Sequence, residues 1–213
     1  KDSTLLPAAE AYREILARNG ITLKVLTSAG SVQNLQRLLD PKQHVDLALV
    51  QGGIAQGVDT SSLMSLGSVF YAPVVVFYRG HGMDRLSQFA GKRIAIGREG
   101  SGTRLLSLAL LGANGIEPGG TTTLLPSDGA EAARQVVTGQ ADAAIFDGDS
   151  ATRAMMLRLL QVPGVSVLDF SEAAAYTRRF PYLNEIDLPP GLLDLGHKIP
   201  PDTVHLIGPT VEI

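Results

Sequence analysis

Short apolar segments with strand character alternate with amphipathic helical segments along almost the whole 213-residue chain, and glycine-containing turns separate them. This alternation is typical of α/β folds, in which helices connect parallel strands. Turns that lead from a strand into a helix lie at the carboxyl edge of such a sheet, where these folds bind ligands. We therefore expect an α/β fold with mostly parallel sheets and a ligand site at these turns.

Apolar periodicity and turn residues predict the individual elements. The expected helices cover residues 7–19, 31–39, 103–113, 128–138, a segment capped by Asp149 or Ser150 and ending at 160, and 171–179. The expected strands cover residues 22–27, 45–50, 66–78 with an interruption at Pro73, 93–97, 121–125, 143–146, 165–170 and 203–207. The proline-rich stretch from Phe180 to the last strand is expected to be irregular.

Composition excludes several classes of function. The chain has no cysteine, which rules out disulfides, thiolate metal sites and cysteine nucleophiles. Its net charge is −3, it has no Lys/Arg block and it lacks tryptophan, a pattern unlike that of a nucleic-acid binder. The four histidines form no metal pair, no GxSxG elbow occurs, and the carboxylates are scattered. We expect no catalytic set, no metal and no cofactor.

The strongest local motif runs from Gly97 to Thr103, between an expected strand and an expected helix. Gly100 and Gly102 let a ligand approach the backbone, and Ser101 and Thr103 supply hydroxyls. The first N–H groups of the helix, at the positive end of its dipole, suit a carboxylate or phosphate. The alternative is an ordinary tight turn with a Ser/Thr cap, and the motif alone favours neither interpretation.

A second turn, Gly30-Ser31, has the same position between strand and helix. Ser31 is expected either to cap its helix or to donate to a ligand. Asn34 lies on the first helical turn and is a candidate to reach into a cleft. A solvated helix residue is the alternative for Asn34, and the motif by itself favours that alternative.

Three further candidates follow strands. Gln51 ends one strand and can both donate and accept hydrogen bonds, and Asp147 ends another and is a candidate acceptor for a ligand ammonium group. Ordinary turn chemistry is the alternative for both, because Asp-Gly is a common turn pair. Tyr71 is a candidate to line a pocket, with a half-buried core tyrosine as the alternative.

The two halves of the chain share a weak internal echo. Gly30-Ser31 with Leu35 is matched by Gly100-Ser101 with Leu105, and the strand that begins at Asp46 is matched by the strand that begins at Asp142. Two α/β lobes of similar design would explain this pattern, and chance agreement at so few positions is the alternative. Two such lobes form a cleft between them, a common place for a small-molecule site.

The ordered set of motifs resembles the TAXI family, the solute receptors of TRAP-type transporters, which have the type II periplasmic-binding-protein fold. The match runs in order over nearly the whole chain. Its motifs are Gly30-Ser31-Val32-Gln33-Asn34-Leu35, residues 46–51, residues 91–97, Gly100-Ser101-Gly102-Thr103, residues 139–143, Phe180-Pro181-Tyr182, Ile186, Leu188-Pro189-Pro190-Gly191 and Thr203-Val204.

The resemblance implies a periplasmic or extracytoplasmic receptor that closes around a small solute and docks on a TRAP-type permease. It leaves open a membrane anchor in the full-length protein. The family is associated with amino acids and carboxylates such as glutamate. By this similarity, the Gly30–Asn34 turn, Gln51, Tyr71 and the Gly100–Thr103 turn would face the solute. Gly52 stands where the family usually has an acidic residue and is included in the expected site.

The resemblance also implies two lobes, with residues 1–74 and 170–213 in lobe one and residues 75–169 in lobe two. The hinge is expected near residues 71–76 and 167–171. Family members usually begin with one more strand and continue beyond the last strand, so we expect a first lobe that is incomplete at both ends.

Two other functions stay open. A ligand-sensing domain of a larger regulatory or membrane protein would use the same fold and pocket. An enzyme on this fold, similar to the pyrimidine-forming thiamin-precursor proteins, would need a histidine or cysteine set in the cleft.

Overall fold

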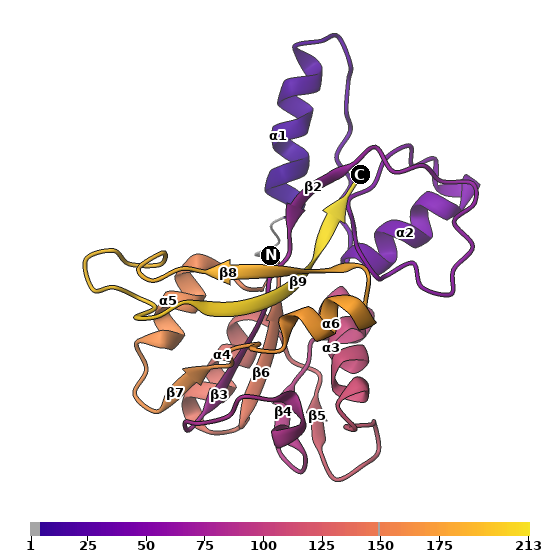
Figure 1. The fold of residues 1–213 in the computed structure, drawn as a ribbon. Coiled ribbons are helices and arrows are strands. Elements are labelled where there is room, and N and C mark those ends of the chain that lie inside the picture. The colour runs from indigo at the N-terminus through magenta and orange to yellow at the C-terminus, as the bar shows by residue number, and fades with distance from the viewer. Residues whose placement is uncertain (1–4, 149) are drawn as a thin grey trace.

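The computed structural model describes residues 5–148 and 150–213, so the expected cap at Asp149 lies outside the described residues. It shows a mixed α/β fold with a compact part and a looser part (Figure 1). We refer to residues 72–207 as the larger unit, and to residues 5–71 together with 208–213 as the smaller unit.

The larger unit is built on a curled sheet in which β5, β4, β6, β3 and β9 are neighbours in that order, while β7 pairs with β3 and β8 with β9. Its strands are β3 (Val74–Arg79), β4 (Arg93–Ala95), β5 (Thr123–Leu125), β6 (Ala143–Asp147), β7 (Val165–Val167), β8 (Leu183–Leu188) and β9 (Val204–Glu212). Its α-helices are α3 (Gly102–Ala113), α4 (Gly129–Thr138), α5 (Arg153–Leu160) and α6 (Ala173–Arg179), with a 3-10 helix at Leu86–Phe89.

Each face of this sheet carries its own apolar cluster. On one face, Ile94 and Ile145 pack with Leu106 and Leu110 of α3. On the other face, Phe77 and Phe146 pack with residues of α4 and α5. Successive side chains of a strand point to opposite faces, so the uninterrupted apolar run of β3 serves both clusters. A sheet covered on both faces gives the larger unit a closed core.

The expected α/β class is confirmed, but the expectation of mostly parallel sheets is wrong. Among the described strands, only β4 pairs in parallel, with β5 and with β6. The strands β3, β8 and β9 pair antiparallel with their neighbours. The reason is that β3 leads into the larger unit and runs against β6, while β9 leads out of it and runs against β3.

The smaller unit contains α1 (Leu5–Ala17), α2 (Ser31–Leu39), a 3-10 helix at Pro41–Gln43, β1 (Val50–Gln51) and β2 (Ser68–Tyr71). Both short strands pair antiparallel with the end of β9. The helix α1 stands apart from the rest of the molecule (Figure 1) and buries none of its residues.

Two expected strands of the smaller unit are wrong. Residues 22–27 form no strand, and the segment expected at 45–50 contributes only Val50–Gln51. A strand exists only where a neighbour completes its hydrogen-bond ladder, and the described residues provide no ladder partner for 22–27. Apolar alternation alone therefore did not suffice here.

The C-terminal region is more regular than expected. Residues 183–188, expected to be irregular, form β8, which pairs with β9 over six consecutive positions. β9 continues to Glu212, five residues beyond the expected end of the last strand. The expected cap of α5 also shifts: the helix begins at Arg153, and the Thr152 hydroxyl accepts from Met155 N at 3.3 Å.

The packing also bears on where the chain crosses between the units. Phe170, Leu183 and Ile207 are buried in the core of the larger unit. Only the end of β9 lies with β1 and β2. This packing favours a second crossing near Gly208 over the one expected at residues 167–171, while the first crossing stays near Tyr71–Val74. We propose these two places as the hinge.

Candidate functional site

Four polar side chains that lie far apart in the sequence meet where the two units touch. Gln51 Nε2 donates to Asp147 Oδ2 at 2.9 Å, and Thr103 Oγ1 donates to Asp147 Oδ1 at 2.7 Å. Ser31 Oγ accepts from the backbone N–H of Gln51 at 3.2 Å. All four residues are buried, with exposed fractions of 3–8%. We call Ser31, Gln51, Thr103 and Asp147 the polar cluster.

Each unit contributes two members of the polar cluster. Asp147 is the last residue of β6 and Thr103 lies in the first turn of α3, so both belong to the larger unit. Ser31 begins α2 and Gln51 is in β1, in the smaller unit. Gly102 leaves room for this contact, because a Cβ atom there would lie 2.9 Å from Gln51 Oε1.

The structure gives the Gly100–Thr103 turn a mixed role. The Ser101 hydroxyl caps α3: it accepts from Arg104 N at 3.2 Å and donates to Arg98 O at 2.7 Å. The cap alternative therefore describes the Ser101 side chain in this structure. Gly100 has φ +75°, a left-handed conformation that favours glycine, and turns the chain into the helix. Thr103 joins the polar cluster instead.

The Gly30–Asn34 turn supports the cluster from the other side. Gly30 precedes α2 with φ +131°, which brings Ser31 to Gln51. Asn34 is not a solvated helix residue here, because its Nδ2 donates to Leu49 O at 2.8 Å. Asn34 thus fixes the segment that leads into β1. Its expected contact with a solute stays a prediction.

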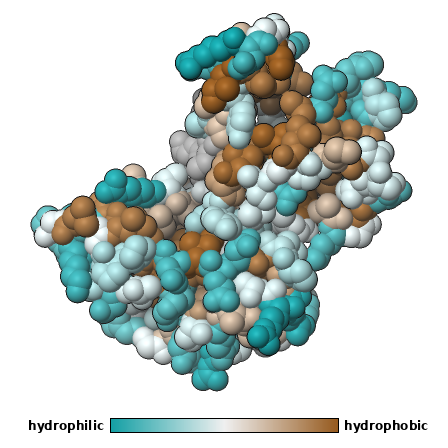
Figure 2. Space-filling model, turned by 45° about the horizontal axis from the view of Figure 1, so that its top comes forward, coloured by the Kyte–Doolittle hydropathy of each residue, from teal (hydrophilic) through white to brown (hydrophobic). Residues whose placement is uncertain are grey.

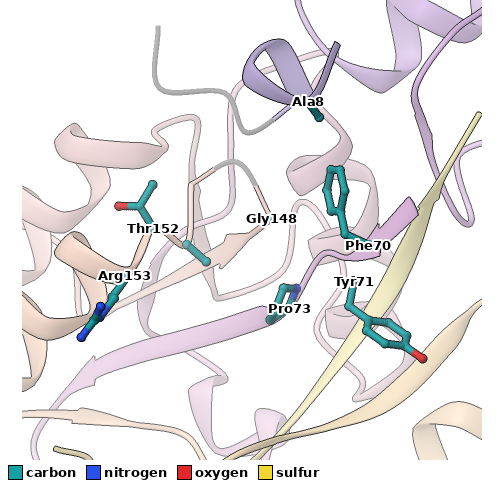
Figure 3. A pocket seen from close by; sticks show the side chains of 8 residues that line it. Ala8, Phe70, Tyr71, Pro73, Gly148, Thr152 and Arg153 are labelled. Carbon is teal, nitrogen blue, oxygen red and sulfur yellow. The ribbon is translucent and has the colours of Figure 1, made fainter. Parts of the chain in front are cut away.

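Tyr71 lies outside the polar cluster. Its side chain is 56% exposed and borders an open cavity of about 480 Å³ between α1, β2 and the start of α5. In Figure 3 the ring of Phe70 points toward Ala8, whereas the ring of Tyr71 points the opposite way. The expected role of Tyr71 at the solute stays a prediction. The cavity is lined by Ala8, Phe70, Tyr71, Pro73, Gly148, Ala151, Thr152 and Arg153.

A second, smaller cavity of about 220 Å³ lies beside the polar cluster, between the residues that follow Gln51 and residues 105–109 of α3. We call it the Tyr182 cavity, after the aromatic ring at its edge. Burial raises the pKa of the Tyr182 hydroxyl above its ordinary value. Its lining residues are Gly52, Gly53, Ile54, Gln56, Leu105, Leu106, Ala109 and Tyr182.

Sequence reasoning included Gly52 in the site but missed the rest of the Tyr182 cavity. Gly53 carries the sequence signal for this cavity. It has φ +86°, and because it lacks a side chain the Tyr182 ring can pack against it: a Cβ atom there would lie 2.5 Å from Tyr182 Cε2. The glycine pair at 52–53 is visible in the sequence. Its partner Tyr182 is 129 residues away and could be found only by folding the chain.

The remaining expectations concern charges and metals. Arg98 is held by an ion pair with Asp128 at 2.7 Å, and Arg104 Nη1 donates to Gly97 O at 3.4 Å. Within residues 5–148 and 150–213, no group of three or more acidic or histidine side chains is placed to hold a metal ion. In the polar cluster, Gln51 and Thr103 donate to the Asp147 carboxylate.

Solved structures with a similar architecture include solute-binding proteins and a regulatory domain. An ancestral arginine-binding protein bound to arginine is 14% identical, with a TM-score of 0.50, and the match covers 75% of this chain and 66% of that protein. The regulatory domain of CcmR from Synechocystis PCC6803, in complex with 2-PG, is 14% identical with a TM-score of 0.51 and coverages of 96% and 81%. The periplasmic aliphatic sulphonate binding protein SsuA from Escherichia coli is 18% identical with a TM-score of 0.49 and coverages of 75% and 51%.

These likenesses show the fold, which is that of the two-lobed periplasmic binding proteins. The matched part of the chain spans 66% or less of the length of the arginine-binding and sulphonate-binding proteins. No curated protein sequence matches the chain. The model of the NMT1-like family matches residues 8–200, nearly the whole chain, and the chain therefore belongs to the NMT1-like family.

Proposed function

We propose that this protein is a solute-binding receptor that takes up its ligand between the two units, at the polar cluster. One observation carries the proposal: buried hydrogen bonds join Gln51 of the smaller unit to Asp147 and Thr103 of the larger unit. Buried polar groups concentrated at the junction of two units are typical of ligand sites in this fold. In this proposal the structure represents the closed form, in which Gln51, Thr103 and Asp147 form hydrogen bonds with one another.

Binding would follow from opening and closing of this junction. When the units separate at the proposed hinge, the hydrogen bond between the Gln51 amide and the Asp147 carboxylate breaks, and a solute can then contact both groups. A ligand that contacts both units shifts the equilibrium toward the closed form by its differential affinity for that form. The ordered elements α3 and β6 hold one half of the site in place, and α2 and β1 bring the other half.

The finer identity rests on the motif resemblance. We propose a TAXI-type receptor in an extracytoplasmic compartment that delivers an amino acid or carboxylate to a TRAP-type permease. The type of protein is supported by the family and by the arginine-binding and sulphonate-binding proteins that share the fold. None of the described helices is long and apolar enough to span a membrane.

Within the site we propose direct solute contacts for Gln51, Thr103 and Asp147. Ser31 positions Gln51 through its backbone N–H, and Gly102 permits the close approach of the Gln51 amide. The remaining expected contacts are Gly30, Asn34, Gly52, Tyr71 and Gly100, of which Gly52 borders the Tyr182 cavity. Ser101 was also expected at the solute, but its hydroxyl caps α3, and we propose no direct solute contact for it. We propose no catalytic role for these residues.

Thermal melting of the protein against a panel of amino acids and carboxylates tests the proposal. A solute present at 100 times its dissociation constant stabilises the folded state by about 2.7 kcal/mol, which gives a clear shift of the melting temperature. We expect a selective shift with one class of solute, and loss of that shift in the Gln51→Ala variant. A cooperatively melting protein that no solute stabilises would contradict a receptor function.

A ligand-sensing domain is the second candidate, favoured by one observation. The CcmR regulatory domain matches 96% of this chain, a larger share than either binding protein matches. Such a domain would use the same polar cluster, but its closure would be read by a flanking DNA-binding or signalling module. The full reading frame discriminates the two: a helix-turn-helix or kinase module beside this chain would favour sensing.

A further inference from the structure

The Tyr182 cavity lies along one face of α3, directly beyond the polar cluster. Gly102, in the first turn of this helix, makes room for the Gln51 amide. Residues three, four and seven positions further on lie on the same side of a helix. At these positions stand the cavity residues Leu105, Leu106 and Ala109. Because a helix rises by about 1.5 Å per residue, Ala109 lies about 10 Å along the axis from Gly102. A solute at the polar cluster therefore has the cavity beside it.

The opposite wall of the cavity comes from the smaller unit. It is formed by residues 52–56, which follow β1. Ile54 is one of the two buried apolar residues in residues 5–71, and its Cδ1 atom would lie 3.5 Å from a Cβ atom at Gly102. The Tyr182 ring packs against the bare side of Gly53. Because both units supply a wall, the cavity is complete only when the units are together.

The lining of the cavity carries no charge. Among the described residues, those that line it include no Asp, Glu, Lys, Arg or His. Its polar side-chain groups are the Gln56 amide and the Tyr182 hydroxyl, and the other side chains are apolar. A charged group that entered this space would lose its hydration without gaining a partner of opposite charge, which disfavours its binding. An apolar group instead gains free energy when the cavity removes it from water.

The volume of the cavity limits what it can hold. An engineered protein cavity of about 150 Å³, lined by leucine, isoleucine and phenylalanine side chains, binds benzene. The Tyr182 cavity, at about 220 Å³, has room for a branched aliphatic chain or a single ring. Sites that enclose a whole drug-sized ligand are larger, at roughly 300–1,000 Å³. The cavity therefore holds one part of the solute, and the rest of the solute lies at the polar cluster.

We infer that the solute carries an uncharged apolar group, a branched aliphatic chain or a single ring, which lies in the Tyr182 cavity while the polar end of the solute contacts the polar cluster. The inference rests on the proposed function and narrows it from amino acids and carboxylates in general to those with an apolar side chain. Solutes with a second charged end, such as glutamate, are disfavoured. Closure buries the apolar group between the units, so this group adds to the preference of the solute for the closed form.

Solutes of nearly equal shape but different polarity test the inference. L-leucine, L-asparagine and L-aspartate differ in whether the branched end is apolar, an amide or a carboxylate. The acids 4-methylpentanoate, succinamate and succinate repeat this series without an amino group, so the test covers both kinds of polar end. Calorimetric titration of the protein measures the six affinities.

A hydrophobic pocket distinguishes a single methylene group by roughly 10- to 200-fold in affinity. In the series that binds, we therefore expect the apolar member to bind at least about 10-fold more tightly than its amide and carboxylate counterparts. The six affinities for wild type are the reference for the variants.

Two variants assign the preference to the cavity. Leu105→Asn places an amide on the wall at a position that is 46% exposed, and should reduce the preference for the apolar member over the amide. Ala109→Leu fills part of the cavity and should weaken binding of the apolar member most. Leu192→Asn, at a position that is 52% exposed and does not line the cavity, is the matched control for Leu105→Asn and should keep the full preference. Cooperative thermal melting of each variant confirms that it is folded.

The outcomes separate the inference from the proposed function. An amide or carboxylate member that binds wild type as tightly as its apolar counterpart would overturn the inference and leave the receptor function intact. The full preference retained by both folded cavity variants would do the same. If none of the six solutes binds, the inference is overturned, and the receptor function is overturned as well when the wider panel of amino acids and carboxylates leaves the melting temperature unchanged. An apolar preference that either cavity variant loses and Leu192→Asn keeps would support both.

Discussion

The two units of this molecule differ in how completely they bury their apolar side chains. In the larger unit, both faces of a sheet are covered and large side chains such as Phe77 and Phe146 are fully buried. In residues 5–71, only Leu35 and Ile54 are buried apolar residues. Nine of the thirteen exposed large hydrophobic residues in the described part of the chain lie in residues 5–71. Figure 2 shows extensive apolar surface on this side of the molecule.

Segments with similar sequence patterns form the same secondary structure only where a neighbouring strand is available to pair with them. Residues 93–95 and residues 22–27 are both short apolar segments before a Gly-Ser turn, yet only the first pairs into a sheet. The polar cluster shows the same difference. Asp147 and Thr103 lie on the well-packed larger unit, whereas Gln51 and Ser31 lie on the smaller unit, which has few buried apolar residues. This looser packing suits the half of the cluster that moves in the proposed opening and closing.

The largest difference in stability between the units is expected from the same type of substitution, Leu→Ala, made once in each unit. Leu110 of α3 is fully buried, and Leu6 of α1 is 40% exposed. Leu110→Ala should lower the free energy of unfolding by about 2–5 kcal/mol, because it removes buried methyl groups and leaves a cavity. Leu6→Ala should cost less than about 1 kcal/mol. Urea denaturation measures both, and equal losses would contradict the difference in packing.

The place where the two units join offers the next largest effect. A Cβ atom at Gly208 would clash with the carbonyl oxygen of Ala72 and lie 2.9 Å from Ile186 Cδ1. Gly208→Ala should therefore destabilise the protein by about 1–3 kcal/mol through overpacking. Gly112→Ala, on a helix where only the flexible Glu117 side chain is near, is the matched control and should be neutral or slightly stabilising. A neutral Gly208→Ala variant would mean that the crossing strands are not closely packed.

The turn before α3 separates capping from solute binding. Ser101→Ala removes the helix cap and should cost about 1 kcal/mol of stability, with solute affinity nearly unchanged. Thr103→Val removes a donor to Asp147 and should weaken solute binding several-fold. Melting curves and calorimetric titration of the two variants give both quantities. A large loss of affinity in Ser101→Ala would show that its hydroxyl contacts the solute after all.

The smallest expected effect is a pH dependence confined to the larger unit. The Arg93 side chain lowers the pKa of Asp142 below its ordinary value. A carboxylate whose pKa is lower in the folded state stabilises the protein above its unfolded pKa, and this contribution is lost as the pH falls toward the folded value. Because the pair is partly exposed, the contribution stays below about 1 kcal/mol.

Urea denaturation at pH 7 and pH 3 measures this contribution. Wild type should lose slightly more stability on acidification than Asp142→Asn. Asp202→Asn, at an exposed position, serves as the control and should behave as wild type does. An Asp142→Asn variant with an unchanged pH dependence would contradict the role of this ion pair.

Much of the larger unit could be predicted from sequence because its signals are local. The helix at 102–113 begins at a Ser cap and ends before Asn114-Gly115, and the strand at 143–147 ends at an Asp-Gly turn. The antiparallel course of β3 and β9 could not be predicted, because strand direction depends on which distant segments pair. β8 was not predicted although its residues Glu185-Ile186-Asp187-Leu188 alternate between polar and apolar, because prolines on both sides of the segment favour an irregular course.

The candidate site was predictable in part. Ser31, Gln51, Thr103 and Asp147 were candidates because each is a polar residue at a strand or helix end, where this class of fold gathers its ligands, and the structure brings the four together. That Asp147 would be the common acceptor for Thr103 and Gln51 depends on contacts 44 and 96 residues apart in sequence. The role of Tyr182 likewise depends on long-range packing against Gly53.

The central claim is that a solute binds between the two units and is held by both. Amide hydrogen exchange of the protein, with and without its most stabilising solute, tests this most directly. We predict that the solute slows exchange in residues 50–54 of the smaller unit and in residues 101–106 of the larger unit at the same solute concentration. Protection confined to one of these segments, or confined to the surroundings of Tyr71 and α1, would contradict the claim.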